Sequence, residues 1–392
     1  MSSTDVLKHI AAEYGTPSYV FDLDVLKKHV QAVRELADGK YRICYSIKAN
    51  PFITACMSEL TDTLEVCSPG ELEICYTLHI APEKILVSGV VKTPDMIRRA
   101  LQYGIRTFTV ESIRHMEMLE QEAAKEDCTA DVLLRKSCAA QFGMSEEDLL
   151  HLIGTRESFP HVMITGIHCF AGTMQKKSDR KVRELEYLKE LYERIEKEYG
   201  VKLAKLEYGP GMPVSLFEGE DFSDPLKPLA ALQAELASFG EDVQVTVEAG
   251  RFFAAACGTY LSRVMDTKRD GETNYVLLDG GMHQINYYGQ MMGMKHPVID
   301  VLKDAGTETA HVCICGALCT TADVLVRDIE LPVLHEGDVL AFRNAGAYSM
   351  CEGAALFLSR DLPAVYLLEN DTVTCVRKHT EMYMWNTPVK GE

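Results

Sequence analysis

A lysine follows an apolar run near the start of the sequence. Lys48 comes directly after Ile43–Ile47, a run that is interrupted only by Ser46. At the end of a buried strand, a lysine can be partly desolvated, which lowers its pKa and lets its amine form a Schiff base. The alternative, which the strand alone favours, is an ordinary surface lysine at a strand terminus.

Two glycine-containing turns follow apolar runs later in the chain. Gly209 and Gly211 belong to YGPGMP, and Gly250 and Arg251 belong to EAGR. Glycine lets backbone N–H groups approach a phosphate closely, and an arginine can add a bidentate contact. A single turn of this kind is usually only a turn. Two of them after late strands of a barrel, together with an arginine, favour a ligand that carries a phosphate.

Small residues surround a cysteine and a tyrosine in the last fifth of the chain. Cys319 lies within Gly316–Asp323, and Tyr348 ends Asn344–Tyr348. Such surroundings permit the close approach of a ligand, but ordinary packing is the alternative because cysteine is among the most buried residue types. His283, which follows DGGM, is either a ligand-binding residue of a loop or a simple turn residue.

The elements that must position these residues alternate from about residue 41 onward. Short apolar runs are followed by longer segments with helical spacing. Eight strands are predicted, at Arg42–Lys48, Thr63–Cys67, Lys84–Ser88, Thr107–Val110, Asp131–Lys136, Val162–His168, Leu203–Tyr208 and Val243–Glu248. This alternation predicts an α/β fold, a (β/α)8 TIM-type barrel over residues 24–252, with a doubly wound open sheet as the alternative. In such a barrel, catalytic residues lie at the carboxyl ends of the strands.

After Arg251 the pattern changes to strands joined by turns. The predicted strands are Thr259–Met265, Tyr275–Asp279, His311–Cys315, Val339–Arg343 and Thr372–Val376. Gly271 and Gly337 supply turn signals between them. We therefore expect a mostly β domain of the sandwich or barrel type, made of residues 1–23 and 253–392.

Composition and net charge limit which partners, metal sites and cellular locations are expected for this protein. The 392 residues carry 40 Lys and Arg against 58 Asp and Glu, a net charge of −18 that disfavours nucleic acid and anionic membrane as partners. The odd number of cysteines, 13, does not predict a disulfide framework. Zinc-ligand spacings, a signal peptide and a long apolar run are all missing from the sequence, so we expect no metal and a cytoplasmic location.

Nine motifs occur along the chain in a characteristic order, from the lysine segment to Tyr348. They are YSIKANP, EVCSPGEL, QFGM, GIHCFAGT, YGPGMP, EAGR, DGGMH, GALCTTAD and NAGAY. Because it has these motifs in this order, the sequence resembles the fold-type III family of pyridoxal-phosphate enzymes. That family includes the diaminopimelate, ornithine and arginine decarboxylases and, more distantly, alanine racemase. The resemblance spans nearly the whole chain.

The resemblance implies roles for residues of the barrel. Lys48 matches the lysine that forms the Schiff base with pyridoxal 5'-phosphate, and Glu248 matches the carboxylate that pairs with the pyridine nitrogen. Arg135 resembles an arginine that lies beside the cofactor ring, near His168 and Phe170. The positions that match those around the cofactor phosphate are Thr173, Gly209, Gly211, Gly250, Arg251 and Tyr348.

For the second domain, the resemblance implies a homodimer with shared active sites. Cys319 matches a cysteine that each subunit lends to its neighbour, close to the carbon that is reprotonated after decarboxylation. His283, Thr320 and Asp323 are expected near the small-molecule amino-acid substrate. The reaction implied is decarboxylation, since a carboxylate such as Glu248 keeps the pyridine nitrogen protonated and the ring a strong electron sink. The alternatives are a racemase or epimerase on the same fold, or a catalytically silent homologue.

Three departures from the family pattern concern the cofactor ring and the substrate. Phe170 stands where these decarboxylases usually have a histidine that stacks on the ring, although His168 lies two residues earlier on the same side of the strand. Thr320 stands where diaminopimelate decarboxylases have an acidic residue. The segment His283–Gln290 has no arginine to grip the distal end of diaminopimelate. The substrate is therefore a free diamino acid, another amino acid, or one conjugated to a carrier protein.

Overall fold

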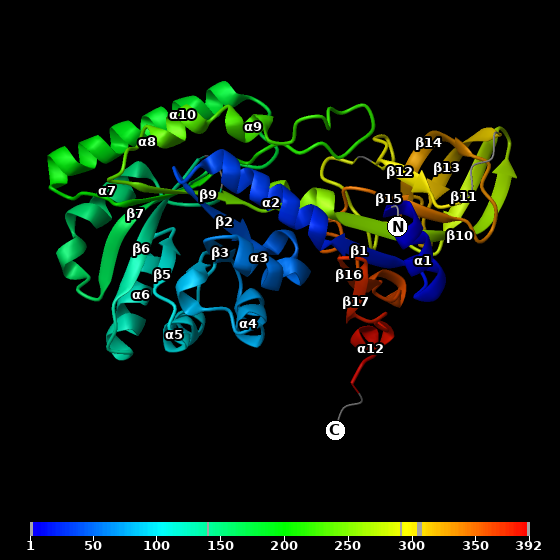
Figure 1. The fold of residues 1–392 in the computed structure, drawn as a ribbon. Coiled ribbons are helices and arrows are strands. Elements are labelled where there is room, and N and C mark those ends of the chain that lie inside the picture. The colour runs from blue at the N-terminus through cyan, green and yellow to red at the C-terminus, as the bar shows by residue number, and fades with distance from the viewer. Residues whose placement is uncertain (1–2, 139–140, 291, 304–307, 390–392) are drawn as a thin grey trace. The chain divides into compact units, whose positions relative to one another are not determined.

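The computed structural model describes residues 3–138, 141–290, 292–303 and 308–389 (Figure 1). Contacts divide the chain into two compact units, which are considered separately. Unit 1 consists of Met1–Lys28, Ser215–Ser223 and Ala254–Glu392, and unit 2 consists of His29–Val214 and Asp224–Phe253. The segment Ser215–Ser223 thus joins unit 1 by its contacts, although it lies between two barrel strands in the sequence.

Unit 2 contains a closed eight-stranded barrel of parallel strands. Its strands are β2 (Arg42–Ser46), β3 (Thr63–Val66), β4 (Ile85–Val87), β5 (Thr107–Val110), β6 (Ala130–Lys136), β7 (Val162–Phe170), β8 (Lys205–Gly209) and β9 (Gln244–Ala249). Pairing of Arg42 with Thr246 joins β2 to β9 and closes the ring. The predicted barrel is therefore confirmed, with each strand end within two residues of its expected place, and the open sheet is excluded.

One helix, α2 (Leu23–Ala37), precedes the first barrel strand, and the other helices follow the barrel strands. They are α3 (Thr54–Leu60), α4 (Pro69–Thr77), α5 (Pro94–Tyr103), α6 (Ile113–Lys125), α7 (Glu146–Gly154), α8 (Ser178–Tyr199), α9 (Lys227–Ala230), α10 (Gln233–Ala237) and α11 (Arg251–Ala254). Side chains cap the starts of α4, α5, α6 and α7; the Thr93 hydroxyl, for example, accepts from the Met96 N–H at 3.2 Å. Pro94 begins α5, where it lacks only an N–H that the helix does not use, and Gly104 ends it in the left-handed region.

One expectation about the first strand is wrong in detail. The strand β2 ends at Ser46, and Lys48 lies in the short 3₁₀ turn η1 (Ile47–Ala49). A second turn, η2 (Pro51–Ile53), follows at once, with the Asn50 side chain accepting from the Phe52 N–H. The Tyr45 hydroxyl donates to the Asn50 carbonyl at 2.9 Å, so the turn that carries the lysine is tied to the buried strand.

Unit 1 is built on a nine-stranded sheet. Its strands are β1 (Ser18–Asp22), β10 (Gly258–Asp270), β11 (Thr273–Leu278), β12 (Ile299–Val301), β13 (Thr309–Cys315), β14 (Val324–Pro332), β15 (Val339–Phe342), β16 (Ala364–Glu369) and β17 (Thr372–Arg377). The sequence pattern missed four of them, β1, β12, β14 and β16. In β14 a register shift places the adjacent exposed residues Arg327 and Asp328 opposite a single residue of β13, which breaks the usual alternation.

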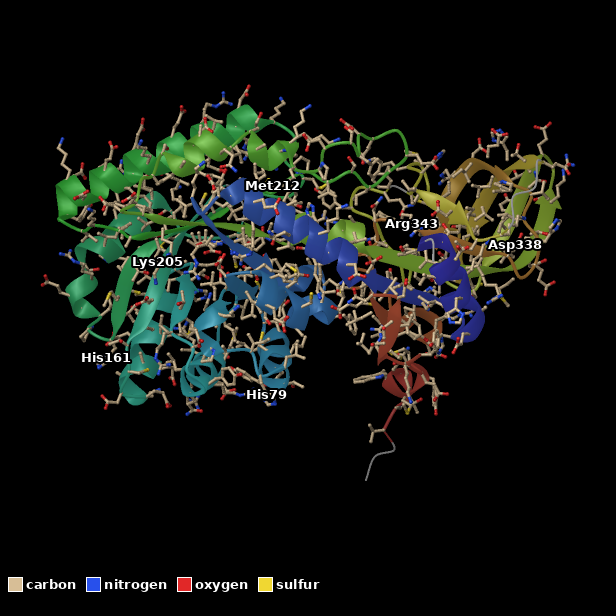
Figure 2. All side chains as sticks on the ribbon, in the orientation of Figure 1. His79, His161, Lys205, Met212, Asp338 and Arg343 are labelled. Atoms are coloured by element: carbon tan, nitrogen blue, oxygen red, sulfur yellow. The ribbon has the colours of Figure 1, made fainter. Side chains whose placement is uncertain are left out.

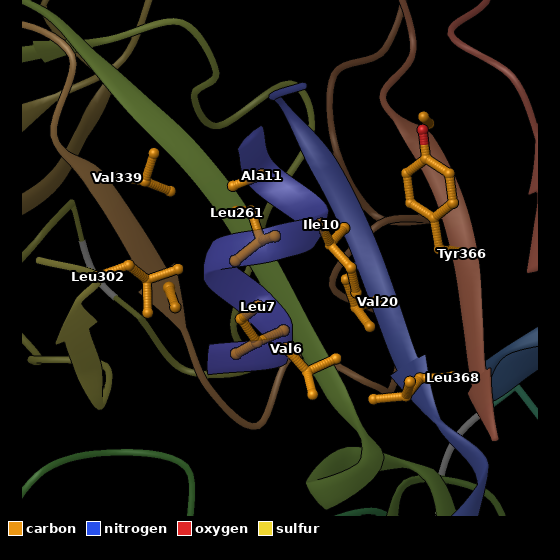
Figure 3. Packing of buried hydrophobic residues seen from close by; sticks show 12 residues of the cluster. Val6, Leu7, Ile10, Ala11, Val20, Leu261, Leu302, Val339, Tyr366 and Leu368 are labelled. Carbon is orange, nitrogen blue, oxygen red and sulfur yellow. The ribbon is translucent and has the colours of Figure 1, made fainter. Parts of the chain in front are cut away.

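The N-terminal helix α1 (Ser3–Glu13) packs on this sheet. Its residues Val6, Leu7 and Ile10 meet apolar side chains from β1, β10 and β16 (Figure 3). Ion pairs add to the same unit: Arg343 binds Asp300 at 2.6 Å, and Asp338 binds Lys303 at 2.8 Å (Arg343 and Asp338 are labelled in Figure 2). Among the described residues, helices long and apolar enough to cross a membrane are not found.

Candidate active site

Lys48 lies at the carboxyl end of the barrel strands in contact with an acid and a thiol. Its ammonium group makes a short ion pair with the buried carboxylate of Glu65, and it lies 3.4 Å from the Cys67 sulfur. Burial alone would raise the pKa of Glu65, but the adjacent Lys48 charge holds that pKa below its usual range. Lys48 is therefore not an ordinary surface lysine at a strand terminus, which was the alternative considered from the sequence.

Glu248 is fixed from two sides at the end of β9. It is 3% exposed, its Oε1 accepts from the Ser46 hydroxyl at 3.2 Å, and its Oε2 lies 2.8 Å from His168 Nε2. Polar atoms of Glu65, His168 and Glu248 all lie within 4.8 Å of one another. Because His168 bonds a carboxylate through Nε2, that nitrogen carries the proton. Its Nδ1 is buried without a hydrogen-bond partner among the described residues.

A further buried acid, Glu207 of β8, lies beside this group. Burial raises the pKa of Glu207 well above its usual value, and the negative charge of Glu248 raises it further. Both effects favour the protonated form of this side chain in the barrel interior. The side chains of Glu207 and Glu65 together make the barrel interior acidic and polar toward the carboxyl ends of the strands.

The turns after β7 and β8 form a tight cradle without side chains. A Cβ on Gly211, whose φ is +57°, would meet the Gly172 carbonyl oxygen at 1.6 Å. The Gln175 N–H donates to the Gly211 carbonyl at 2.8 Å, which joins the two turns. Thr173 is exposed in the first turn, and Met212 in Figure 2 marks the second. Glycine-containing turns of this kind suit an anionic group such as a phosphate, which backbone N–H groups can bind.

The other predicted barrel residues lie at neighbouring strand ends. Arg251 is buried directly after Gly250. Phe170 packs on β8, since a Cβ on Gly209 would meet its Cδ2 at 2.4 Å. Arg135 pairs with His168 in the strand register, and its Nη1 donates to Glu111 Oε1 at 2.9 Å.

Lys92, a buried lysine near Glu111 and Arg135, was not predicted from the sequence as a site residue. Lys92 Nζ donates to the Gly89 carbonyl at 2.7 Å, and burial lowers the pKa of Lys92 to about 8. Glu65, Glu207 and Glu111 were also missed. Each lies in or directly after a predicted strand and follows an apolar residue, and an acid in that setting was the available signal.

The predicted substrate residues form a second group, within unit 1. Both carboxylate oxygens of Asp323 accept backbone N–H groups, from Met282 at 2.7 Å and from Leu318 at 2.8 Å. Asp323 thereby holds together the loops that carry His283 and Cys319, and its geometry is that of a positioning residue. Cys319 is exposed, and the Thr320 hydroxyl accepts from the Ala322 N–H.

His283 and Tyr348 have unusual settings in the same unit. His283 is 1% exposed, and neither ring nitrogen has a hydrogen-bond partner among the described residues. Burial, with a smaller effect of the Arg360 charge, lowers the pKa of His283 to about 4, so the ring is neutral. Tyr348 has a φ of +64°, in the left-handed region that costs a non-glycine residue energy.

The barrel residues fit pyridoxal phosphate as a group. A glycine cradle that a Cβ would fill suits its phosphate, the fixed carboxylate of Glu248 suits a protonated ring nitrogen, and Lys48 supplies an amine for its aldehyde. His168 has an unused buried nitrogen beside them.

Comparison with known proteins agrees with this fit. The profile of the family described as "Pyridoxal-dependent decarboxylase, pyridoxal binding domain" matches residues 23–255. A relative from Niallia circulans, L-glutamyl-[BtrI acyl-carrier protein] decarboxylase, is 27% identical and covers 94% of this chain and 92% of its own. Diaminopimelate decarboxylase of Zymomonas mobilis is 28% identical and covers 95% and 92%. The crystal structure of AQ1208 from Aquifex aeolicus superimposes with a TM-score of 0.85 at 26% identity, covering 96% and 92%.

The chain belongs to the family of pyridoxal-dependent decarboxylases. It is an enzyme, an amino-acid decarboxylase that uses pyridoxal 5'-phosphate. The racemase and the silent homologue considered from the sequence are not favoured, since the relatives named above are decarboxylases. The predicted fold, cofactor and class of reaction are confirmed.

Proposed function

We propose that Lys48 binds the cofactor aldehyde and that Glu248 pairs with the cofactor ring nitrogen during decarboxylation. The observation that carries this proposal is the connected group Lys48–Glu65 and Ser46–Glu248–His168 at one end of the barrel. When bound, pyridoxal phosphate supplies an electron sink for the pair left behind by the departing carboxylate. The protein's share is to orient this cofactor and to hold protons at defined atoms.

Each barrel residue then has a distinct task. Glu248 holds the proton on the ring nitrogen, and His168, as a positioning residue, holds Glu248. Glu65 holds the Lys48 ammonium in place through their ion pair. Arg251, Thr173 and the backbone around Gly209 and Gly211 bind the phosphate, while Phe170 and Arg135 flank the ring.

The substrate we propose is an α-amino acid whose side chain ends in an amide or thioester rather than in a second free amino acid group. The segment His283–Gln290 contains no arginine or lysine, and Thr320 is uncharged. Both oxygens of Asp323 are engaged by backbone N–H groups, which leaves them poor partners for a distal ammonium. The Niallia circulans relative acts on a glutamyl group attached to a carrier protein, which is a substrate of this kind.

The proposed enzyme works as a homodimer in which Cys319 completes the site of the partner subunit. Support comes from the exposure of Cys319 in a loop that Asp323 holds in place. Mixing Lys48→Ala and Cys319→Ala subunits tests it, because half of the dimers are then mixed and each has one intact site, giving about a quarter of wild-type activity. Zero recovered activity after proven subunit exchange would contradict the shared site.

The proposed location is the cytoplasm. The chain has 13 cysteines, an odd number, and Cys319 and Cys375 among them are exposed. Free thiols persist in reducing compartments, whereas an oxidising one would tend to pair or modify the exposed members of this set.

The deciding experiment offers substrates to the cofactor-loaded enzyme in D₂O and follows the products by mass spectrometry. We expect loss of CO₂ with gain of one deuterium from a pantetheine thioester of L-glutamate, and slow or no turnover of free meso-diaminopimelate. Faster turnover of free diaminopimelate would overturn the substrate proposal. Deuterium exchange without loss of mass across the panel would overturn decarboxylation itself.

A further inference from the structure

Two cysteines, one in barrel strand β7 and one just after the neighbouring strand β6, lie in direct contact beside the cofactor residues. Cys169 belongs to β7, between His168 and Phe170, and is 1% exposed. Cys138 follows the end of β6 and is partly exposed. Their sulfur atoms are 3.1 Å apart, closer than two sulfurs approach in ordinary van der Waals contact. A disulfide needs about 2.05 Å, so an approach of about 1 Å would join them.

We propose that Cys138 and Cys169 are a site of reversible oxidation, forming a disulfide in response to a low-molecular-weight disulfide and thereby weakening cofactor binding. The accessible sulfur is the first to react and the buried one is the second. This inference concerns residues outside the decarboxylation chemistry and goes beyond the proposed function.

The two thiols differ in the way that such a reaction requires. The hydrogen bond from Cys169 lowers the pKa of the Cys138 thiol below its usual value, even though burial opposes this. The same contact, together with burial, raises the pKa of Cys169. The charge of Glu184 opposes a thiolate at Cys138, and the charge of Lys136 has a smaller effect in its favour. The thiolate is the reactive form, so Cys138 is the nucleophile of the pair.

The chemistry balances with the external disulfide as oxidant. The Cys138 thiolate attacks one sulfur of the external disulfide, the S–S bond breaks, and one thiolate leaves. Cys169 gives its proton to that thiolate and attacks the Cys138 sulfur, which releases the second thiolate, protonated from water. Two protein thiols are oxidised to one disulfide, and the external disulfide is reduced to two thiols.

A metal ion at the same place is less favoured by the geometry. Glu184 lies within 4.8 Å of both sulfurs, which makes a set of three possible ligands in the described part of the chain. Its carboxylate already accepts from the Tyr208 hydroxyl at 2.8 Å. Zinc with thiolate ligands takes four ligands in structural sites.

The disulfide would act on the cofactor site through the end of β7. The neighbours of Cys169 along the strand are His168, which holds Glu248, and Phe170, which packs on Gly209. The turn Gly172–Thr173, part of the glycine cradle, follows directly. Misplacement of such groups by about 1 Å can cost up to 100-fold in function, so a loss of at least about tenfold in cofactor affinity is expected.

The test treats the cofactor-loaded enzyme with oxidised glutathione, blocks the remaining thiols, and maps disulfides after trypsin. Cleavage after Lys136, Arg156 and Lys176 gives two peptides, residues 137–156 and 157–176, with Cys138 and Cys169 as their single cysteines. We expect these peptides joined by a bond that dithiothreitol reverses. The Cys313–Cys315 pair, with sulfurs 3.8 Å apart on one strand, is the internal control.

Cofactor affinity is measured before and after oxidation, from the visible absorbance of the bound cofactor. We expect the dissociation constant to rise at least about tenfold in wild type and in Cys313→Ser, and to stay constant in Cys138→Ser and Cys138→Ala. Failure of the two peptides to become linked would overturn the oxidation site. A linked enzyme with unchanged affinity, or an equal loss in the Cys138 variants, would overturn its effect on the cofactor. Neither measurement needs a substrate, so its outcome is independent of the proposed function.

Discussion

The glycine cradle gives the sharpest quantitative prediction. In Gly211→Ala the new methyl group would lie 1.6 Å from the Gly172 carbonyl oxygen, and the two turns must separate by about 2 Å before the contact becomes an ordinary one. Separation breaks the Gln175–Gly211 hydrogen bond, and the φ of +57° adds left-handed strain. At about 1 kcal/mol for the bond and 1–2 kcal/mol for the strain, the loss is about 2–3 kcal/mol. If this loss falls on cofactor binding, the dissociation constant rises about 30- to 150-fold.

The assay is titration of the cofactor-free enzyme with pyridoxal phosphate, followed by visible absorbance, with thermal unfolding measured alongside. Gly219→Ala is the matched control, because its φ of +77° imposes similar strain while nothing lies within 4 Å of its Cβ position. We expect the control to bind the cofactor like wild type. Should Gly211→Ala bind within threefold of wild type while remaining folded, the phosphate assignment for this cradle is refuted.

Three further predictions concern single residues. Lys48→Ala should abolish turnover while leaving the circular dichroism unchanged, and the thermal unfolding temperature should fall because the buried Glu65 carboxylate loses its ion-pair partner; full activity would reject the role of Lys48. His168→Phe removes a hydrogen bond to a buried carboxylate and should lower kcat about tenfold, with partial rescue in His168→Gln and a shifted pH titration of the bound cofactor's absorbance. The pKa of His283 is about 4 in the folded chain and about 6.5 when unfolded, so the unfolded state takes up the proton first. Stability should therefore fall as pH drops from about 6.5 to 4, and urea unfolding of His283→Phe should lack this fall.

Much of the fold could be predicted because the barrel repeats one simple pattern. Each strand is a short apolar run buried on both faces, and each run is followed by an amphipathic segment. The strands of unit 1 were harder to predict from the sequence. Strand β14 carries two adjacent exposed charges at a register shift, and β1 comes from the other end of the chain. Pairing between strands that are far apart in the sequence cannot be predicted from the residues in a short window.

The sequence by itself determined the family of this protein, its cofactor, and which turns must be free of side chains, because these depend on residue types in a fixed order. Only the tertiary structure decided which groups meet. Glu65 reaches Lys48, His168 fixes Glu248, and Cys138 contacts Cys169, in each case between residues on different strands or on the turns that follow them. The physical reason is closure of the barrel: it gathers the ends of strands far apart in the chain, and only their register sets which side chains touch.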